Sequence, residues 1–295
     1  MRTKDTWSAA TQQLIQDKWD RLLQDKPPPR YFREIVRRST ADFIVTLDDE
    51  DFVSQVIDSL YAGDVWVLER SFTPAELATL REAVLSFRAG KAMGGERIVE
   101  GASDFHEIVD GSDAPRGGYV AVDHSAFFFR WNNTGAKIFA LVDRIWSLQK
   151  MLSGHAPHAF ETNTPKDLSV DRIQFIQYPL GAGKITPHRD PFAVMKAAVG
   201  IYLSTFGEDF KQGGFFVARG PGDLVPIDPL LKAGDTALWF PGLIHGVEPV
   251  DPHSAVDWSA DTGRWFIALN TVESAYVQNR RVAVPVELDG QDAAR

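Results

Sequence analysis

The sequence contains no cysteine, and this absence excludes several classes of protein. Disulfide scaffolds, thiolate metal sites and cysteine nucleophiles all depend on the thiol group. Any metal ion must therefore be held by the side chains of His, Asp or Glu.

Long apolar runs and an excess of basic residues are also lacking. No run approaches the ~20 apolar residues that a helix needs to cross a bilayer, and residues 1–14 lack the apolar core of a secretory signal. The 31 Lys and Arg against 40 Asp and Glu give a net charge of -9, which disfavours nucleic acid. We therefore expect a cytoplasmic protein with neither a membrane nor a nucleic-acid partner, and the oligomeric state stays open.

What is present is typical of one folded domain, with 44% hydrophobic residues over a length of 295. Residues 1–165 are predicted to be mainly helical, with active-site-covering loops, and 281–295 to form a tail. Helical patterns cover residues 10–25, 49–61 and 136–152, another helix begins at Thr73, and residues 65–68 form a strand. The irregular stretch 92–131, which contains His106 and His124, is expected to cover a site.

From about residue 166 to residue 280 the sequence becomes rich in short β-type runs separated by turns. Such a series predicts a sandwich or a barrel, with the helical half packed on it. The predicted strands are residues 172–178, 197–206, 214–218, 223–227, 236–240, 245–250 and 264–272.

One short segment has the spacing of a metal site. His188 and Asp190 stand two residues apart, and in an extended chain such residues point to the same face. A third ligand must come from elsewhere, and His245 begins a later predicted strand. Two imidazoles and one carboxylate on one face of an octahedral ion leave positions open, an arrangement that suits ferrous iron.

These residues lie within a wider pattern that resembles the 2-oxoglutarate/Fe(II) dioxygenases, in particular their prolyl-4-hydroxylase-like branch. The resemblance covers residues 170–275, and its parts occur in the family's order. They are residues 178–181 leading into 188–190, then 209–217, 233–240, and 245–250 followed by 263–266. The resemblance implies an α+β fold whose core is a double-stranded β-helix, or jelly roll. It also implies Fe(II), 2-oxoglutarate and O₂ as cofactor and cosubstrates, with His188, Asp190 and His245 as metal ligands and catalytic residues.

By the same resemblance, Arg264 would bind the C5-carboxylate of 2-oxoglutarate, because a guanidinium grips a carboxylate with two hydrogen bonds. The alternative is that Arg264 ends its strand and pairs with Asp261. Tyr178 occupies a position where related enzymes place a tyrosine on the cosubstrate, although a purely structural role is an equal alternative. Gln174 shares the inward face of Tyr178 and is a further cofactor-binding candidate.

The favoured function is therefore hydroxylation of a C–H bond in a small molecule, such as an amino acid derivative or a secondary metabolite. A peptidyl hydroxylase of the same class and a non-catalytic cupin-like binding protein are alternatives. A zinc hydrolase with the same ligands is another, for which Glu248 is the nearest candidate base in sequence.

Overall fold

A computed structural model describes residues 9–95, 97–112 and 119–288, so the first eight residues and the end of the predicted tail lie outside the described residues. The helices are α1 (Ala9–Asp25), α2 (Thr40–Thr46), α3 (Glu50–Tyr61), α4 (Pro74–Gly90) and α5 (Ala136–Leu152). The strands are β1 (Ile35–Ser39), β2 (Val65–Glu69), β3 (Phe105–Val109), β4 (Ala121–Phe129), β5 (Ser169–Tyr178), β6 (Lys184–Arg189), β7 (Ala198–Tyr202), β8 (Gly214–Gly220), β9 (Asp223–Pro226), β10 (Thr236–Trp239), β11 (His245–Glu248), β12 (Arg264–Glu273) and β13 (Val284–Pro285).

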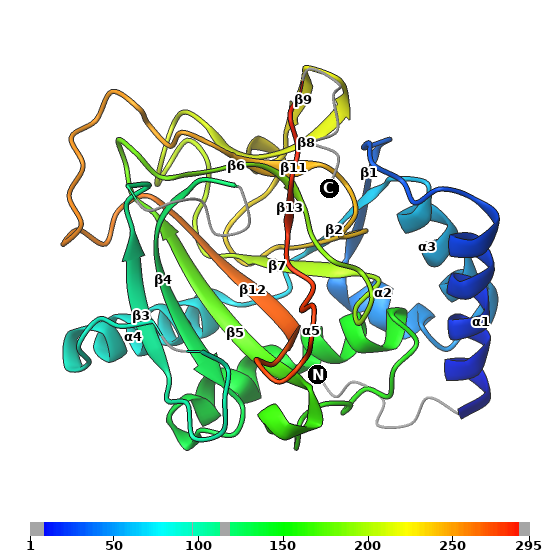
Figure 1. The fold of residues 1–295 in the computed structure, drawn as a ribbon. Helices are drawn as coiled ribbons and strands as arrows, with labels where there is room; N and C mark the ends of the chain where they lie inside the picture. Colours follow the sequence, from blue (N-terminus) through cyan, green and yellow to red (C-terminus); the bar gives the residue numbers. More distant parts are fainter. Residues whose placement is uncertain (1–8, 96, 113–118, 289–295) are drawn as a thin grey trace.

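Strands β5 to β12 form a jelly roll (Figure 1). One antiparallel sheet has the order β5-β12-β7-β10, and the other has the order β6-β11-β8-β9. Along the chain the strands alternate between the two sheets, apart from the hairpin β8–β9, as a jelly roll requires. The predicted α+β fold with a double-stranded β-helix core is confirmed.

The first sheet is extended on both sides by strands from the N-terminal half. Strand β2 pairs with β10 and in parallel with β1, while β4 pairs with β5 and β3 pairs with β4. The stretch 92–131 is therefore more regular than its sequence indicated. His106 and His124 lie on β3 and β4 and are buried, not exposed on a loop over the site.

Helices α3 and α4 begin where the sequence provides capping groups. Asp49 accepts hydrogen bonds from the first backbone N–H groups of α3, and Thr73 forms a capping box with Glu76 at the start of α4. Helix α5 is tied to β5 by the buried ion pair between Lys150 Nζ and Asp171 Oδ2, at 2.7 Å. The predicted helices are present, and they flank the jelly roll and leave its interior free for a site.

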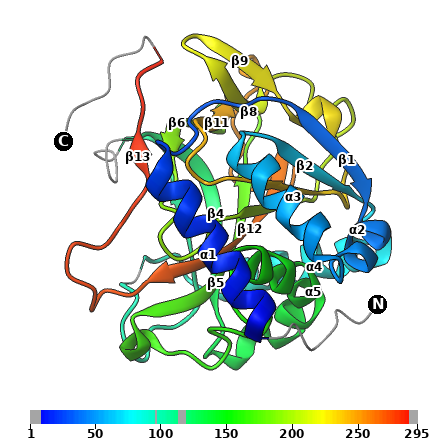
Figure 2. The same cartoon turned by 90° about the vertical axis from the view of Figure 1, so that its right-hand side faces the viewer.

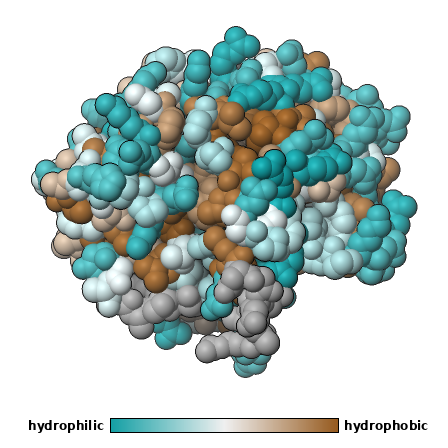
Figure 3. Space-filling model, turned by 90° about the horizontal axis from the view of Figure 1, so that it is seen from above, coloured by the Kyte–Doolittle hydropathy of each residue, from teal (hydrophilic) through white to brown (hydrophobic). Residues whose placement is uncertain are grey.

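Helix α1 lies on the outside of this arrangement, next to α3 (Figure 2). The indole N–H of Trp19 on α1 donates to the carbonyl of Leu152 at the end of α5, at 2.8 Å. One hydrophobic core includes residues of these helices and of both sheets. Seen from above, hydrophobic surface gathers in the middle of the molecule and hydrophilic side chains surround it (Figure 3). None of the helices among the described residues has the length and apolar character needed to cross a bilayer.

A buried histidine pair joins β3 to β4. His106 Nε2 donates to the carbonyl of Lys91, so its Nδ1 is free to accept from His124 Nε2, at 3.1 Å. Burial, followed by the charge of Arg88, lowers the pKa of His124 to about 3. The unfolded chain therefore binds a proton at His124 below about pH 6.5, whereas the folded chain stays neutral there until much lower pH.

This difference predicts acid destabilisation between about pH 6.5 and pH 3. Going from about pH 7 to pH 5 should lower the free energy of unfolding by about 1–2 kcal/mol through His124 alone. Urea unfolding measures this loss, which should be smaller in His124→Asn and unchanged in His158→Asn, where the replaced histidine is exposed. If the free energy of unfolding fell equally with pH in the wild type and both variants, His124 would accept a proton in the folded protein without loss of stability.

Candidate metal centre and its cavity

The candidate metal ligands meet because β6 and β11 are paired. His245 lies directly opposite His188 in the antiparallel register, and their rings are 4.3 Å apart between centroids. Gly246 permits this approach, since a Cβ there would stand 2.7 Å from the carbonyl oxygen of Ile185 on β6. The sequence therefore brings two histidines, 57 positions apart by their numbers, onto one edge of the cavity.

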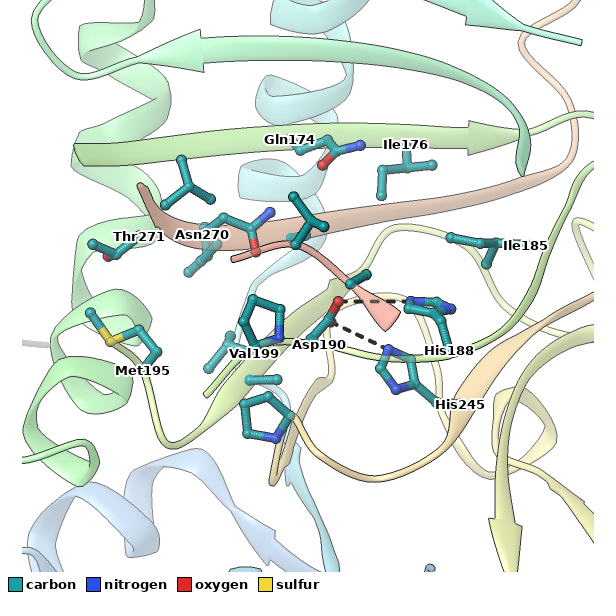
Figure 4. A pocket seen from close by; sticks show the side chains of 18 of the residues that line it. Gln174, Ile176, Ile185, His188, Asp190, Met195, Val199, His245, Asn270 and Thr271 are labelled. Carbon is teal, nitrogen blue, oxygen red and sulfur yellow. Dashed lines mark ion pairs between the residues drawn. The ribbon is translucent and has the colours of Figure 1, made fainter. Parts of the chain in front are cut away.

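Asp190 completes the group just beyond the end of β6. Its carboxylate faces both rings, 3.8 Å from His188 Nε2 and 3.4 Å from His245 Nε2 (Figure 4). One ligand atom from each residue lies within 4.8 Å of the others. The predicted spacing thus brings all three predicted ligands together, and this group could hold an iron ion.

Hydrogen bonds orient both imidazoles toward the common centre. His188 Nδ1 donates to the carbonyl of Thr186 at 2.9 Å, and His245 Nδ1 donates to the carbonyl of Leu243 at 2.8 Å. A carbonyl only accepts, so each Nδ1 carries the proton and each Nε2 keeps its lone pair. Such partners fix the tautomer and ring orientation of metal-binding histidines.

The protonation states also suit metal binding. Burial, followed by the neighbouring His245, lowers the pKa of His188 to about 4. Burial acts to raise the pKa of Asp190, but its close neighbour His245, together with His188 and Arg172, lowers it overall. At neutral pH His188 is therefore neutral and Asp190 is ionised, which are the forms that bind a cation.

The three ligands face a cavity of about 330 Å³ inside the jelly roll. Its walls include the inward face of β5 and β12, where Gln174, Ile176 and Asn270 point into it (Figure 4). Residues 280–283 of the C-terminal segment also line the cavity, and β13 pairs with β6 beside His188. A volume of this size is at the lower end for ligand pockets.

Arg264 lies at one end of this wall, buried and opposite Tyr178. It lines the cavity, but it pairs with Asp228, with Nε 2.6 Å from Oδ2 and Nη2 3.2 Å from Oδ1. The alternative pairing with Asp261 is therefore wrong. Burial lowers the pKa of Arg264, but Asp228 and the nearby tyrosines raise it overall, so the guanidinium stays charged.

The surroundings of Arg264 offer neutral hydrogen-bond donors. Its guanidinium carbon lies 5.4 Å from the ring centre of Tyr178 and 5.3 Å from that of Tyr202. Burial raises the pKa of both phenols, which therefore stay protonated. The Tyr202 hydroxyl and the Trp239 indole N–H are buried without a hydrogen-bond partner among the described residues. This end therefore has unused polar groups, as a site for a bound carboxylate would.

Gln174 and Glu248 differ in position. Gln174 lines the cavity, where it accepts from Arg172 Nη2 at 3.2 Å and donates to Ser125 Oγ at 3.1 Å. Glu248 is exposed at the end of β11 and does not line the cavity. The candidate base for a zinc hydrolase is therefore directed away from the metal ligands.

Comparison with known proteins gives matches at the level of structure alone. No protein-family model matches the chain, and no curated protein matches it. It is similar to a prolyl hydroxylase solved with a hypoxia inducible factor peptide from Trichoplax adhaerens, with 15% identity, a TM-score of 0.49, and 77% of this chain and 91% of that chain covered. It is also similar to a Pseudomonas putida prolyl-4-hydroxylase, with 13% identity, a TM-score of 0.46, and 74% and 97% covered.

A third similar structure is the epimerase SnoN in complex with Fe³⁺, alpha ketoglutarate and nogalamycin RO. It has 12% identity and a TM-score of 0.40, with 81% of this chain and 96% of that chain covered. The names of these structures agree with the family that the sequence resembles. With identities this low, the geometry of this chain's own site must carry the functional argument.

Several cavity residues were not found from the sequence. Tyr119 stacks on His188 with ring centres 5.2 Å apart, and Phe215 and Trp239 contact His245 edge-on. No role in the site was predicted for Trp239, Arg172 or Asn270. Alternation with Gln174 and Tyr178 along the predicted strand was the signal that could have identified Arg172.

Replacement of Asp190 by Ala should weaken binding of Fe(II) by more than the 10–100-fold that loss of a supporting residue costs, because one of three ligands is removed. Anaerobic titration calorimetry with Fe(II) alone measures this. His253→Ala, at an exposed histidine, should bind Fe(II) as the wild type does. Tight binding retained in Asp190→Ala would mean that the ion is held elsewhere.

Proposed function

We propose that this protein is a mononuclear non-haem Fe(II) oxygenase that uses 2-oxoglutarate and O₂ to hydroxylate a C–H bond of a small molecule. The observation that carries the proposal is the set of two oriented Nε2 atoms and one ionised carboxylate at the edge of a cavity inside the jelly roll. Three ligands on one side leave the opposite positions of an octahedral ion open for cosubstrate and O₂. When bound, the iron would supply the activation of O₂, the chemistry that side chains lack.

The chain's own residues would position the two organic reactants. Arg264, held by Asp228, is the proposed partner of the C5-carboxylate of 2-oxoglutarate, and the neutral hydroxyl of Tyr178 is a second donor beside it. Phe215 and Trp239 pack against His245 and keep water from the ligand side of the site. Each cycle would convert the substrate C–H group, 2-oxoglutarate and O₂ into the hydroxylated product, succinate and CO₂.

The alternatives fit this geometry less well. A zinc hydrolase needs a general base near the metal-bound water, and Glu248 is exposed outside the cavity. A peptide substrate needs an open groove, whereas residues 280–283 line one side of a cavity of about 330 Å³. A cupin-like binding protein has no need for two histidines whose tautomers are fixed toward a common point.

The test is anaerobic addition of Fe(II) and then 2-oxoglutarate to the full chain. A weak visible charge-transfer band should appear, because the 2-oxo acid chelates the iron. The band should be lost in His188→Ala and kept in His253→Ala. Absence of the band in the wild type, together with no 2-oxoglutarate binding by calorimetry, would refute the oxygenase proposal.

Arg264→Lys should weaken 2-oxoglutarate binding by roughly tenfold to a hundredfold, because one of the charged hydrogen bonds of the guanidinium fork, worth ~1.5–3 kcal/mol, is lost. Lysine keeps a positive charge beside Asp228, so the buried carboxylate is not left unpaired. Calorimetry of the Fe(II)-loaded protein measures the change, and Arg219→Lys, at an exposed arginine, is the control. Unchanged affinity in Arg264→Lys would limit Arg264 to holding Asp228.

A further inference from the structure

The wall formed by β5 and β12 has a second polar end that the proposed function does not use. In the register of these strands, Arg264 lies opposite Tyr178, and Asn270 lies opposite Arg172. All four residues line the cavity. Arg172 is six residues from Tyr178 along β5, which corresponds to roughly 20 Å at ~3.3 Å per residue.

Arg172 has few partners for a guanidinium at this depth. Its Nη2 donates to Gln174 Oε1 at 3.2 Å, and its guanidinium carbon lies 5.0 Å from the ring centre of Phe127. The Nε atom is buried and has no hydrogen-bond partner among the described residues. Burial, followed by the charge of Arg280, lowers the pKa of Arg172 to about 10. The group is thus charged at neutral pH but incompletely compensated.

Two other arginines packed within the fold have carboxylate partners, whereas Arg88 has none among the described residues and donates to Gln177 and to the carbonyl of His124. Arg264 pairs with Asp228, and Arg130 pairs with Asp143 and Asp171. Arg172 forms no ion pair within the described residues. Arg172 is half-buried, and it differs from Arg88 in that it lines the cavity. Withdrawing a charge from water without a partner is costly, so a guanidinium in this state beside a cavity is suited to receive an anion.

The residue opposite Arg172 strengthens this interpretation. Asn270 points into the cavity (Figure 4), and its amide makes no side-chain hydrogen bond to the described part of the chain. A planar guanidinium and an amide on adjacent strands can together donate to both oxygens of one carboxylate. The cavity lining also includes the apolar side chains of Ile176, Val199 and Met195, and Val199 lies between Asn270 and the metal ligands in Figure 4.

We propose that Arg172 and Asn270 bind a carboxylate of the substrate, and that the substrate is a small carboxylic acid with an apolar body. The identification of this acid as the substrate rests on the proposed function. The backbone positions at the Arg172 and Arg264 ends of the wall lie roughly 20 Å apart, which exceeds the length of 2-oxoglutarate, so a cosubstrate at Arg264 would leave Arg172 free.

A buried hydrogen-bond acceptor on Gln149, which lines the same cavity, indicates which further group the acid carries. Gln149 donates from Nε2 to the carbonyls of Ala197 and Leu269, at 2.9 and 3.2 Å, which leaves Oε1 facing away from both. That oxygen is buried without a partner among the described residues, and Gln149 lines the cavity. An amino or hydroxyl group on the acid would satisfy it, so an amino or hydroxy acid fits better than a plain one.

The test compares ligands that differ by one group at a time. Anaerobic calorimetry of the full chain loaded with Fe(II) and 2-oxoglutarate would use a series of carboxylates from butyrate to octanoate, with 4-methylvalerate, its α-amino analogue leucine, and its amide 4-methylvaleramide. At least one acid should bind with a Kd in the millimolar range or lower. Leucine, which adds the amino group, should bind at least as tightly as 4-methylvalerate. The amide, which lacks the carboxylate, should bind at least tenfold more weakly than 4-methylvalerate.

Variants then assign the binding to Arg172. Arg172→Gln should weaken the acid that binds best by tenfold or more and leave the affinity for 2-oxoglutarate unchanged, while Arg172→Lys should retain part of the binding. Arg219→Gln removes an exposed positive charge that does not line the cavity and should change neither affinity.

Three results would overturn the inference: no binding of any acid in the wild type, equal acid affinity in Arg172→Gln, or a loss of 2-oxoglutarate binding instead. The last would assign Arg172 to the cosubstrate. A different result would separate the two proposals. If the protein binds no 2-oxoglutarate, with or without Fe(II), but still binds the acid in a way that depends on Arg172, the anion site stands and only the proposed function is refuted.

Discussion

The pairing of β6 with β11 is the interaction on which the site depends. It places His188 opposite His245, and the two strands belong to the same sheet of the jelly roll. A shift of one residue would turn one imidazole to the other face of the sheet, because side chains alternate along a strand. Gly246 on β11 leaves room for this close approach. The meeting of the candidate metal ligands is therefore a consequence of sheet register, and local hydrogen bonds then orient the two imidazoles.

The register of β5 and β12 arranges the rest of the cavity in the same way. One face of this strand pair carries Tyr178 and Arg264 at one end and Arg172 and Asn270 at the other. The positive charges of the two arginines are balanced to different extents, because Asp228 pairs with Arg264 while Arg172 has no ion pair among the described residues. The cavity thus has two cationic ends of different character, with the metal ligands in the same lining.

Local patterns were sufficient to predict most elements and the three ligand candidates from the sequence. The cap at Thr73, the helical periodicity of residues 136–152 and the two-residue spacing of His188 and Asp190 are short-range signals, and the structure contains each of them. Contacts between residues far apart in the sequence were not predictable from such local patterns. Asp228 meets Arg264 across 36 residues, and residues 280–283 reach the cavity from the expected tail. Strands β3 and β4 were missed because their aromatic and polar residues lack alternation.

The two acids that we propose for this cavity would have to be kept out of each other's places. At Arg264 the carboxylate of Asp228 offsets the charge, so an incoming acid would be held by directional hydrogen bonds and by chelation of its 2-oxo acid group. At Arg172 no ion pair within the described part of the chain offsets the charge, so the bound anion itself would balance it, with an adjacent amide as a second donor. A simple acid without the 2-oxo group would gain little at the first end, and 2-oxoglutarate would give up its chelation by moving to the second. The proposed discrimination would therefore follow from placing one compensated and one uncompensated arginine at backbone positions roughly 20 Å apart along the same strand pair.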